Sequence, residues 1–211
     1  MPDELKDRKA VFESNLAALR ESFPMVEIDN ARIKDVTALL VNPADFRKVM
    51  EKLAGWDEIP MNYLRCLTAI DRLTHIEVVY ILMHLPGGEE IGVIARCPRE
   101  AGVLKSVQDL WRSADYQERE VYDFFGVKFD GHPDLRRIFM REDVKGHPLL
   151  KDYPKGGDPE DLRILEAHLP EGWLEKMEEE KKRLKTWFDA EVEKIKSGEA
   201  GKPAEPSKPK E

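Results

Sequence analysis

The stretch "NYLRCLTAIDRLTHIEVVYILMHLPGGEEIGVIARC", residues 62–97, decides the fold of this chain. It contains three runs rich in β-branched and aromatic residues, at 62–70, 75–85 and 90–97, and these runs predict three strands. Pro86-Gly87-Gly88 separates the last two runs, so we expect these strands to form a hairpin.

The chain before this stretch predicts two more strands and two helices. Residues 25–29 and "VTALLV" (36–41) are typical of strands. Apolar residues recur at helical spacing over 2–23, and Pro24 ends that helix.

A second helix is predicted between the strand at 36–41 and the strand at 62–70. Asn42 is a suitable N-cap, Pro43 suits the first helical position, and Gly55 ends the helix. The resulting βαβββ order predicts an α+β fold: a two-layer domain with a mainly antiparallel mixed sheet and helices on one face.

Composition limits the classes of function. The chain has 211 residues, a net charge of −8, 41% hydrophobic residues and 36% charged residues, which suits one compact domain with polar extensions. An acidic chain is a poor match for nucleic acid as a main partner. We expect a cytosolic chain, soluble by itself, since no apolar run approaches the roughly 20 residues of a membrane span and "MPDELKDRKA" does not resemble a signal peptide.

Cys66 and Cys97 are the only cysteines. We expect both to be small buried apolar side chains, with a disulfide or a shared metal left open if their strands are neighbours. Two thiols do not provide the four ligands that an iron–sulfur cluster usually takes. Nor do Ser106, Ser113 or the Gly87-Gly88 pair lie in a nucleophile or phosphate-binding motif.

Residues 106–126 predict a third helix. Asp115 and Glu118 have the spacing of a capping box, and Gly126 ends the helix. On a helical wheel Glu118 lies within the apolar arc, where a carboxylate requires a partner. We expect a buried ion pair with Arg136 or Arg137, and keep a functional acid and an inter-subunit contact as alternatives.

The opposite arc of this helix carries Arg119, Glu120 and Asp123. We expect this arc to face solvent. Arg119 and Asp123 have the i,i+4 spacing of a surface ion pair, which contributes only a few tenths of a kcal/mol.

Helical periodicity fades after Gly126, yet residues 127–165 are too apolar for disorder. We therefore expect this segment to hold its shape only by packing on another protein. The predicted division is a domain over 1–126, an extended docking arm over 127–170, an amphipathic charged helix over 171–196 and a flexible tail over 197–211.

The arm contains Gly-His-Pro twice, with His132 and His147 in the same frame. Glycine permits a sharp turn, and the residue before proline is extended. The favoured interpretation is that hydrogen bonds of the two histidines fix the arm. A metal-dependent enzyme is the alternative, with further ligands from Asp134, Glu142 or Asp143.

The motifs over 110–154 bear a family resemblance. "LWRSADYQEREVYDFFGVKFDGHPDLRRI" (110–138), followed by Glu142-Asp143 and "GHPLLKDYP" (146–154), resembles the signature region of the thirty-kilodalton subunit of respiratory complex I, the NADH–quinone oxidoreductase. The strands around "HIEVVYILMHL" (75–85) are similar to that family more loosely.

Two positions depart from the usual family pattern. Arg141 stands where the family commonly has proline, and Leu150 stands where it commonly has arginine. The departures leave open the equivalent subunit of an energy-converting membrane-bound hydrogenase, a deazaflavin-dependent dehydrogenase or a sulfur-reducing complex. A free-standing adaptor that binds a client through the helix at 171–196 is a weaker alternative.

The resemblance implies a subunit with no catalytic residue, cofactor or metal of its own, on the cytoplasmic side of the cell membrane. Iron–sulfur clusters, and a quinone site where the complex has one, would lie in partner subunits. The implied partners are the large hydrogenase-like subunit of the forty-nine-kilodalton type and the iron–sulfur subunits, with the membrane arm contacted indirectly. The predicted interface or structural residues are Glu118, Arg119, Glu120, Asp123, His132, Asp134, Arg136, Arg137, His147, Lys151, Asp152 and Tyr153.

Overall fold

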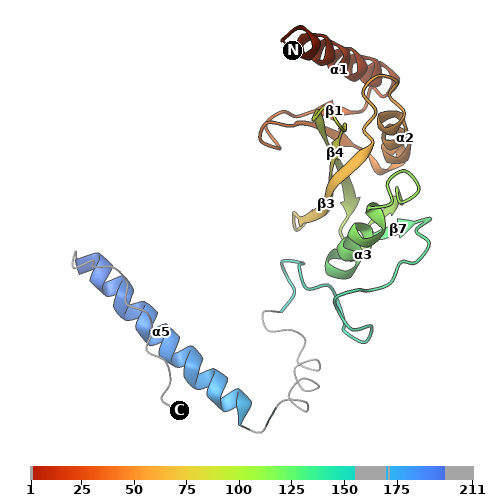
Figure 1. Ribbon diagram of the computed structural model, residues 1–211. Helices are drawn as coiled ribbons and strands as arrows, with labels where there is room; N and C mark the ends of the chain where they lie inside the picture. The colour runs from red at the N-terminus through yellow and green to blue at the C-terminus, as the bar shows by residue number, and fades with distance from the viewer. Residues whose placement is uncertain (1, 155–169, 171, 198–211) are drawn as a thin grey trace. The chain divides into compact units, whose positions relative to one another are not determined.

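Figure 1 shows the computed structural model, which describes residues 2–154, 170 and 172–197. The chain divides into two compact units, residues 1–155 and 156–211, and each is described by itself. The end of the predicted arm at 155–169 and the tail at 198–211 lie outside the described residues.

A five-stranded sheet with the order β1-β2-β5-β4-β3 forms the centre of the first unit. β2 runs parallel to β5, and the other neighbours are antiparallel, so the predicted mainly antiparallel mixed sheet is confirmed. The predicted β4–β5 hairpin is also confirmed. The strands are β1 (Glu27–Ile28), β2 (Thr37–Val41), β3 (Tyr63–Asp71), β4 (His75–Met83) and β5 (Glu90–Pro98).

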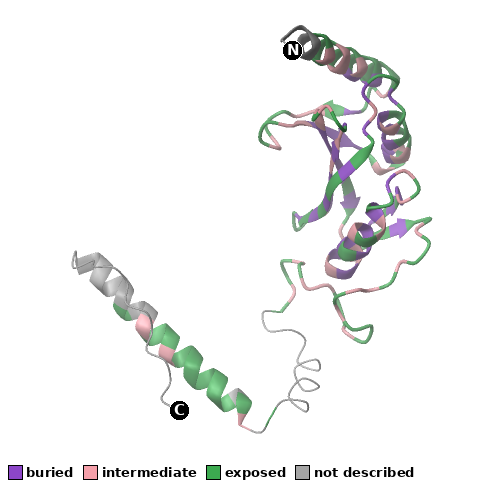
Figure 2. Ribbon diagram, in the orientation of Figure 1, coloured by how far each residue is buried: buried purple, intermediate pink, exposed green. Residues whose placement is uncertain are grey.

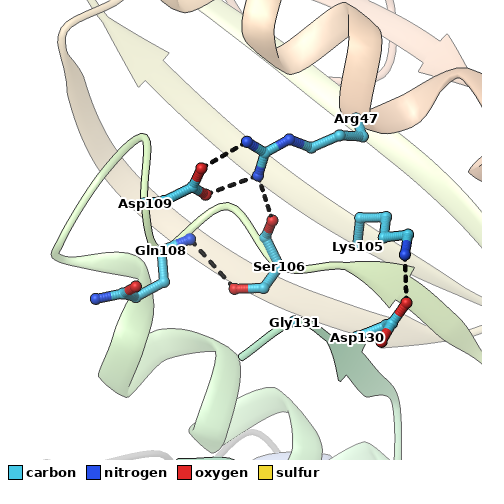
Figure 3. A pocket seen from close by; sticks show the side chains of 7 residues that line it. All are labelled: Arg47, Lys105, Ser106, Gln108, Asp109, Asp130 and Gly131. Atoms are coloured by element: carbon cyan, nitrogen blue, oxygen red, sulfur yellow. Dashed lines mark hydrogen bonds and ion pairs between the residues drawn. The ribbon is translucent and has the colours of Figure 1, made fainter. Parts of the chain in front are cut away.

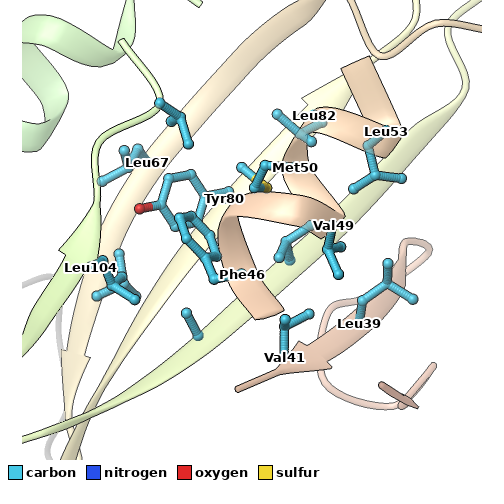
Figure 4. Close-up of a cluster of buried hydrophobic side chains, with 14 of the residues drawn as sticks. Leu39, Val41, Phe46, Val49, Met50, Leu53, Leu67, Tyr80, Leu82 and Leu104 are labelled. Carbon is cyan, nitrogen blue, oxygen red and sulfur yellow. The ribbon is translucent and has the colours of Figure 1, made fainter. Parts of the chain in front are cut away.

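Three of the described helices contribute buried side chains to the main core on one face of this sheet. They are α1 (Pro2–Ser22), α2 (Pro43–Ala54) and α3 (Ala114–Phe125). In α2 a buried stripe at helical spacing, Phe46, Val49, Met50 and Leu53, packs on side chains from the central strands (Figure 4). The ring centroid of Phe46 lies 5.0 Å from that of Tyr80 in β4. The two-layer α+β prediction is therefore confirmed.

Alternate residues of the strands face the opposite side of the sheet. There a smaller apolar cluster of Ala38, Leu40, Val79 and Ile94 is buried, with Ile33 of the preceding loop packed against it. No described helix contributes to this cluster.

The prediction for the start of α3 is wrong, because the helix begins at Ala114 and not at 106. The Ser106 hydroxyl accepts the Gln108 N–H (3.2 Å), and the Trp111 indole donates to the Met61 carbonyl (2.8 Å), so the preceding residues form separate turns. The predicted capping box is absent as well, since Ser113 is the N-cap and its side chain makes no cap bond. Gly126 ends the helix at φ +80°, as predicted.

Two short parallel strands, β6 (Val103–Lys105) and β7 (Lys128–Asp130), join the segments before and after α3. They were not expected from the sequence, because three residues carry too little alternation. The two cysteines are free: Cys97 is buried as expected, whereas Cys66 is exposed, contrary to expectation. β4 separates their strands, so they cannot pair.

In the second unit the predicted charged helix is α5 (Trp173–Ser197). Trp173, Met177 and Leu184 are 41–43% exposed there. The side chains of Phe188, Val192 and Ile195 lie outside the described residues. The alternative that this helix binds a client protein stays a prediction.

We expect Phe46→Ala to lower the free energy of unfolding by about 3–5 kcal/mol, because it removes a fully buried ring from the α2–sheet contact. Urea unfolding measures the change. Met25→Ala is the control, since Met25 is 68% exposed and should cost no more than about 0.5 kcal/mol. Similar losses for both variants would contradict this placement of the core.

Candidate functional site

The candidate site is the face of α3 together with the described part of the arm, residues 127–154. Figure 2 shows buried residues on α3 and mainly intermediate and exposed residues along the arm. Polar groups of α3 and of the β3–β4 turn bind the arm at several points.

Glu118 is buried, as the helical wheel predicted. One carboxylate oxygen accepts the Val107 N–H (2.8 Å), and the other accepts the Ser106 hydroxyl (2.7 Å). The predicted ion pair with Arg136 or Arg137 is wrong, because those arginines contact other carboxylates.

Burial raises the pKa of Glu118 to about 7, although the bonds from Val107 and Ser106 oppose the shift. Asp109 and Asp115 add a smaller upward contribution by charge repulsion. The side chain of His132 is also fully buried, with its Nε2 4.0 Å from the Glu118 carboxylate. Glu118 is thus a buried carboxyl that titrates close to neutral pH.

Asp123 is also fully buried, which contradicts the expectation that its arc faces solvent. One carboxylate oxygen accepts three consecutive amide N–H groups of the arm, from Ile138 (3.0 Å), Phe139 (2.8 Å) and Met140 (2.9 Å). The other oxygen lies 3.3 Å from the Arg137 guanidinium. Burial alone would raise the pKa of Asp123, but these bonds lower it below its usual range.

Arg119 is 7% exposed. The predicted surface ion pair between Arg119 and Asp123 is wrong, because Asp123 pairs with Arg137 instead. The Arg119 Nε donates to the Arg136 carbonyl (3.2 Å), and its guanidinium lies 4.0 Å from the Asp134 carboxylate. Glu120 is exposed, as expected. The arm therefore covers two of the three polar positions on this side of α3.

The two histidines bind carbonyls of α3. His132 Nε2 lies 3.1 Å from the Asp115 carbonyl, and its Nδ1 accepts the Asp134 N–H (3.0 Å), so Nε2 carries the proton. His147 Nδ1 donates to the Asp123 carbonyl (2.9 Å). The interpretation that hydrogen bonds of the histidines fix the arm is confirmed.

Gly126 is required where His147 packs. A Cβ at this position would lie 2.7 Å from the His147 ring, and the φ of +80° disfavours any side chain. Gly126 therefore ends α3 and admits the second Gly-His-Pro turn.

The end of the arm is held by Asp71 of β3, which was not predicted from the sequence. Its carboxylate accepts the Lys151 N–H (2.8 Å) and binds the Arg99 guanidinium (2.9 Å), and Arg99 also contacts Asp152. The hydrogen bond from Arg99 is the main cause that lowers the pKa of Asp71. The alternation of β3 puts Asp71 on the core side of the strand, and this signal could have revealed it.

For residues 127–154, the expectation that the arm holds its shape only on another protein is therefore wrong. Leu135 and Leu150 pack against the core of the chain itself. Arg137 donates to the Gly146 carbonyl (2.8 Å), and a Cβ on Gly146 would lie 3.3 Å from the Tyr153 ring, so the arm also contacts itself.

A pocket of about 390 Å³ lies beside this site, lined by residues of α2, β6, β7 and the turn after β6 (Figure 3). The Arg47 guanidinium donates to both oxygens of Asp109 (2.7 and 2.6 Å), and Lys105 pairs with Asp130. Its two cations are thus already neutralised, which leaves little charge for an anionic ligand. The described residues contain no group of three His, Cys, Asp or Glu side chains that could hold a metal ion.

Comparison with known proteins identifies the family of this chain. Residues 39–159, more than half of the chain, match the family described as the 30 Kd subunit of respiratory-chain NADH dehydrogenase. The chain belongs to this family. The resemblance seen in the sequence is confirmed, and the matched range includes α3 and the described arm.

Two relatives and one solved structure illustrate the match. The chain is 44% identical over 121 residues to NADH-quinone oxidoreductase subunit 5 of Thermus thermophilus, which covers 52% of this chain and 58% of that subunit. It is 40% identical over 137 residues to an NADH-quinone oxidoreductase subunit of Moorella thermoacetica, covering 64% and 90%. A chain of an archaeal membrane-bound sulfane sulfur reductase shares the fold, with a TM-score of 0.59, 24% identity and coverage of 75% and 93%.

We expect Asp123→Ala to release the arm from α3, because it leaves the N–H groups of residues 138–140 without their acceptor and removes the carboxylate that pairs with Arg137. Losing one partner of such a buried charged group typically costs about 3–5 kcal/mol. Urea unfolding measures the cost, and hydrogen exchange at Ile138 and Met140 locates it. Glu120→Ala on the exposed face is the control, and equal exchange in both variants would contradict the assigned role of Asp123.

Glu118 predicts a pH dependence of stability. Its pKa is about 7 in the folded chain and near 4.5 when unfolded, so between these values only the folded state binds the proton. The free energy of unfolding should therefore fall as pH rises from 5 to 8, by about 2.5 kcal/mol through this group.

Urea unfolding of the wild type and of Glu118→Gln at pH 5, 6, 7 and 8 isolates this contribution. The amide keeps an acceptor for the Val107 N–H and does not ionise, so the variant should gain stability relative to the wild type as pH rises. A difference between the two proteins that stays constant with pH would contradict the assigned pKa.

Proposed function

We propose that this chain is a non-catalytic subunit in the peripheral arm of a membrane-bound, ion-pumping respiratory redox complex. In this proposal it packs on the large hydrogenase-like subunit and stabilises the electron-transfer module. Membership of the 30 Kd subunit family supports the assignment. The relatives are subunits of NADH-quinone oxidoreductases, which by their names work in assemblies.

The outer surface of the arm carries the proposal. On the arm, Phe139 and Leu149 are 64% and 53% exposed, and Arg136 and Arg141 are exposed too; Tyr116 of α3 is 67% exposed. Aromatic residues and arginine are enriched at the centres of protein interfaces. A partner that covers this surface would bury side chains which the chain itself leaves in water.

The arm is shaped before the partner arrives. The Asp123 carboxylate orders residues 138–140, and the Phe139 ring stacks on Phe124 with centroids 5.2 Å apart. Binding a rigid segment costs less conformational entropy than ordering a flexible one. This supports a docking role for the outer side of the arm, while its inner side is bound to α3.

The cofactors and the location follow from the same proposal. Iron–sulfur clusters, and quinone where the complex uses it, would be held by the partner subunits, and the chain would lie at the cytoplasmic side of the membrane. Within the part of the chain that the structure describes, no helix is long and apolar enough to cross a bilayer.

The equivalent subunit of a related hydrogenase, deazaflavin-dependent or sulfur-reducing complex is the second candidate. Leu150, one of the two departures from the family pattern, packs against the core of this chain. An apolar side chain suits that position, so the departure has a local reason and does not by itself select one complex.

The test is co-expression of the tagged full-length chain with the reading frames adjacent to its gene. The wild-type chain should co-purify with a larger partner. The double variant Phe139→Ala with Leu149→Asp should reduce the recovered partner by about tenfold or more, which corresponds to about 1.4 kcal/mol or more. Band intensities at equal bait loading measure the effect.

Met25→Asp is the matched control, because it adds the same charge at an exposed apolar residue away from the arm. Urea unfolding of both variants checks that the fold is kept. A wild-type chain that stays monomeric in the presence of its neighbours would overturn the proposal, and so would equal recovery with the double variant and the control.

A further inference from the structure

We propose a second docking surface on the side of the sheet to which no described helix of the first unit contributes, which receives a partner segment with carboxylates beside an apolar side chain. We call it the arginine patch: Arg32, Arg72 and Arg96 around Glu77, with Ile70 and Leu73 beside them. The inference rests on the proposed function, since the partner would be another subunit of the same complex.

Three arginines from three segments converge on one carboxylate. Glu77 in β4 is 2% exposed at its side chain, and it contacts Arg72 (2.8 Å), Arg32 (3.0 Å) and Arg96 (3.3 Å). Asp29 is a second, weaker partner of Arg32 at 3.4 Å. Positive charge is therefore in excess at this spot, on a chain whose net charge is −8.

The arginines are held in place but keep donors facing solvent. Their side chains are 26%, 43% and 46% exposed for Arg32, Arg72 and Arg96, and each guanidinium has five N–H donors. Burial alone would raise the pKa of Glu77, but the bonds from Arg72 and Arg32 lower it, so the central carboxylate stays charged. A guanidinium fork binds a further carboxylate in two-point geometry.

Two exposed apolar residues adjoin the arginines. Ile70 pairs with Glu77 across the β3–β4 ladder, and Glu77 pairs with Arg96, so the three lie in one row across the sheet. Ile70 is 38% exposed, and Leu73 at the tip of the β3–β4 turn is 59% exposed. Apolar side chains flanked by arginine are typical of an interface core with a charged rim.

Leu73 adopts an unusual backbone conformation. Its φ is +68°, a region that leucine rarely adopts, and its N–H donates to the Asp71 carboxylate (2.7 Å). Glycine or asparagine would suit this turn better if only local geometry mattered. Backbone strain of this kind is often retained at functional sites. Here the strained residue, Leu73, exposes an apolar side chain to solvent.

A protein segment suits the patch better than a bilayer does. An anionic membrane attracts extended clusters of basic residues, whereas this chain carries a net charge of −8 around a small patch. The patch also lies along one row of the sheet, formed by Ile70, Glu77 and Arg96. The guanidinium groups of Arg32 and Arg72 lie on the same carboxylate, which favours an acidic protein segment.

The experiment measures protection of Leu73 in the assembled complex. Leu73→Cys is made in a Cys66→Ser background, because Cys66 is exposed and would react, and Met25→Cys in the same background is the control. Both are labelled with a maleimide, in the free chain and in the co-purified complex. Assembly should slow labelling at position 73 at least tenfold and leave position 25 within about twofold.

Substitutions test the chemistry of the partner. Leu73→Asp should weaken recovery of the partner about tenfold, whereas Leu73→Lys should weaken it less, because only aspartate repels carboxylates. Equal losses from both would overturn the acidic partner. Flotation of the chain with vesicles that contain phosphatidylserine, lost in Leu73→Asp, would assign the patch to a membrane and overturn the proposal too.

The two proposals fail separately. If the wild-type chain recovers no partner, the proposed function is wrong. If the complex assembles and position 73 is labelled as fast as in the free chain, the arm interface stands and only the arginine patch is wrong.

Discussion

The site depends on one buried carboxylate. Asp123 accepts three consecutive amide N–H groups of the arm and contacts Arg137, so a single side chain of α3 satisfies backbone donors that would otherwise need water or a partner. Without such an acceptor, the N–H groups of residues 138–140 would lie beside the helix with no partner on it. With it, the arm becomes part of the domain, and its outer side chains have fixed positions.

The same helix holds a second carboxyl under opposite conditions. Glu118 receives two hydrogen bonds and no close arginine, so burial dominates and raises its pKa to about 7. Asp123 receives four donors, three backbone N–H groups and the Arg137 guanidinium, so its pKa is lowered although its side chain is also closed off from solvent. The number of donors, and not burial alone, therefore decides which carboxyl is charged at neutral pH. One anchors the arm by charge, and the other ties α3 to the turn after β6.

The sequence predicts the sheet, α2 and the burial of Glu118, because each depends on local alternation or on the apolar face of one helix. It fails at Arg119 and Asp123, because a helical wheel cannot show that a later segment covers the polar face. The start of α3 is missed because the apolar pattern of residues 106–113 suits a helix. Hydrogen bonds of the Ser106 and Trp111 side chains hold these residues in turns instead. The family, in contrast, can be recognised from the sequence, because its motif is a dense run of residues over 110–154. In the structure this run forms α3 and the described arm.

The repeated Gly-His-Pro now has a physical explanation. His132 binds the carbonyl of Asp115 and His147 binds the carbonyl of Asp123, so the two turns attach the arm near the start and near the end of α3. These carbonyls are eight residues apart, which is about 12 Å along a helix. The chain between the turns must therefore leave the helix and return, and it does so around the Asp123 carboxylate. Each Gly-His-Pro turn thus brings a histidine to a carbonyl of α3, through Nε2 in His132 and Nδ1 in His147, and the loop between the turns presents Phe139 to solvent.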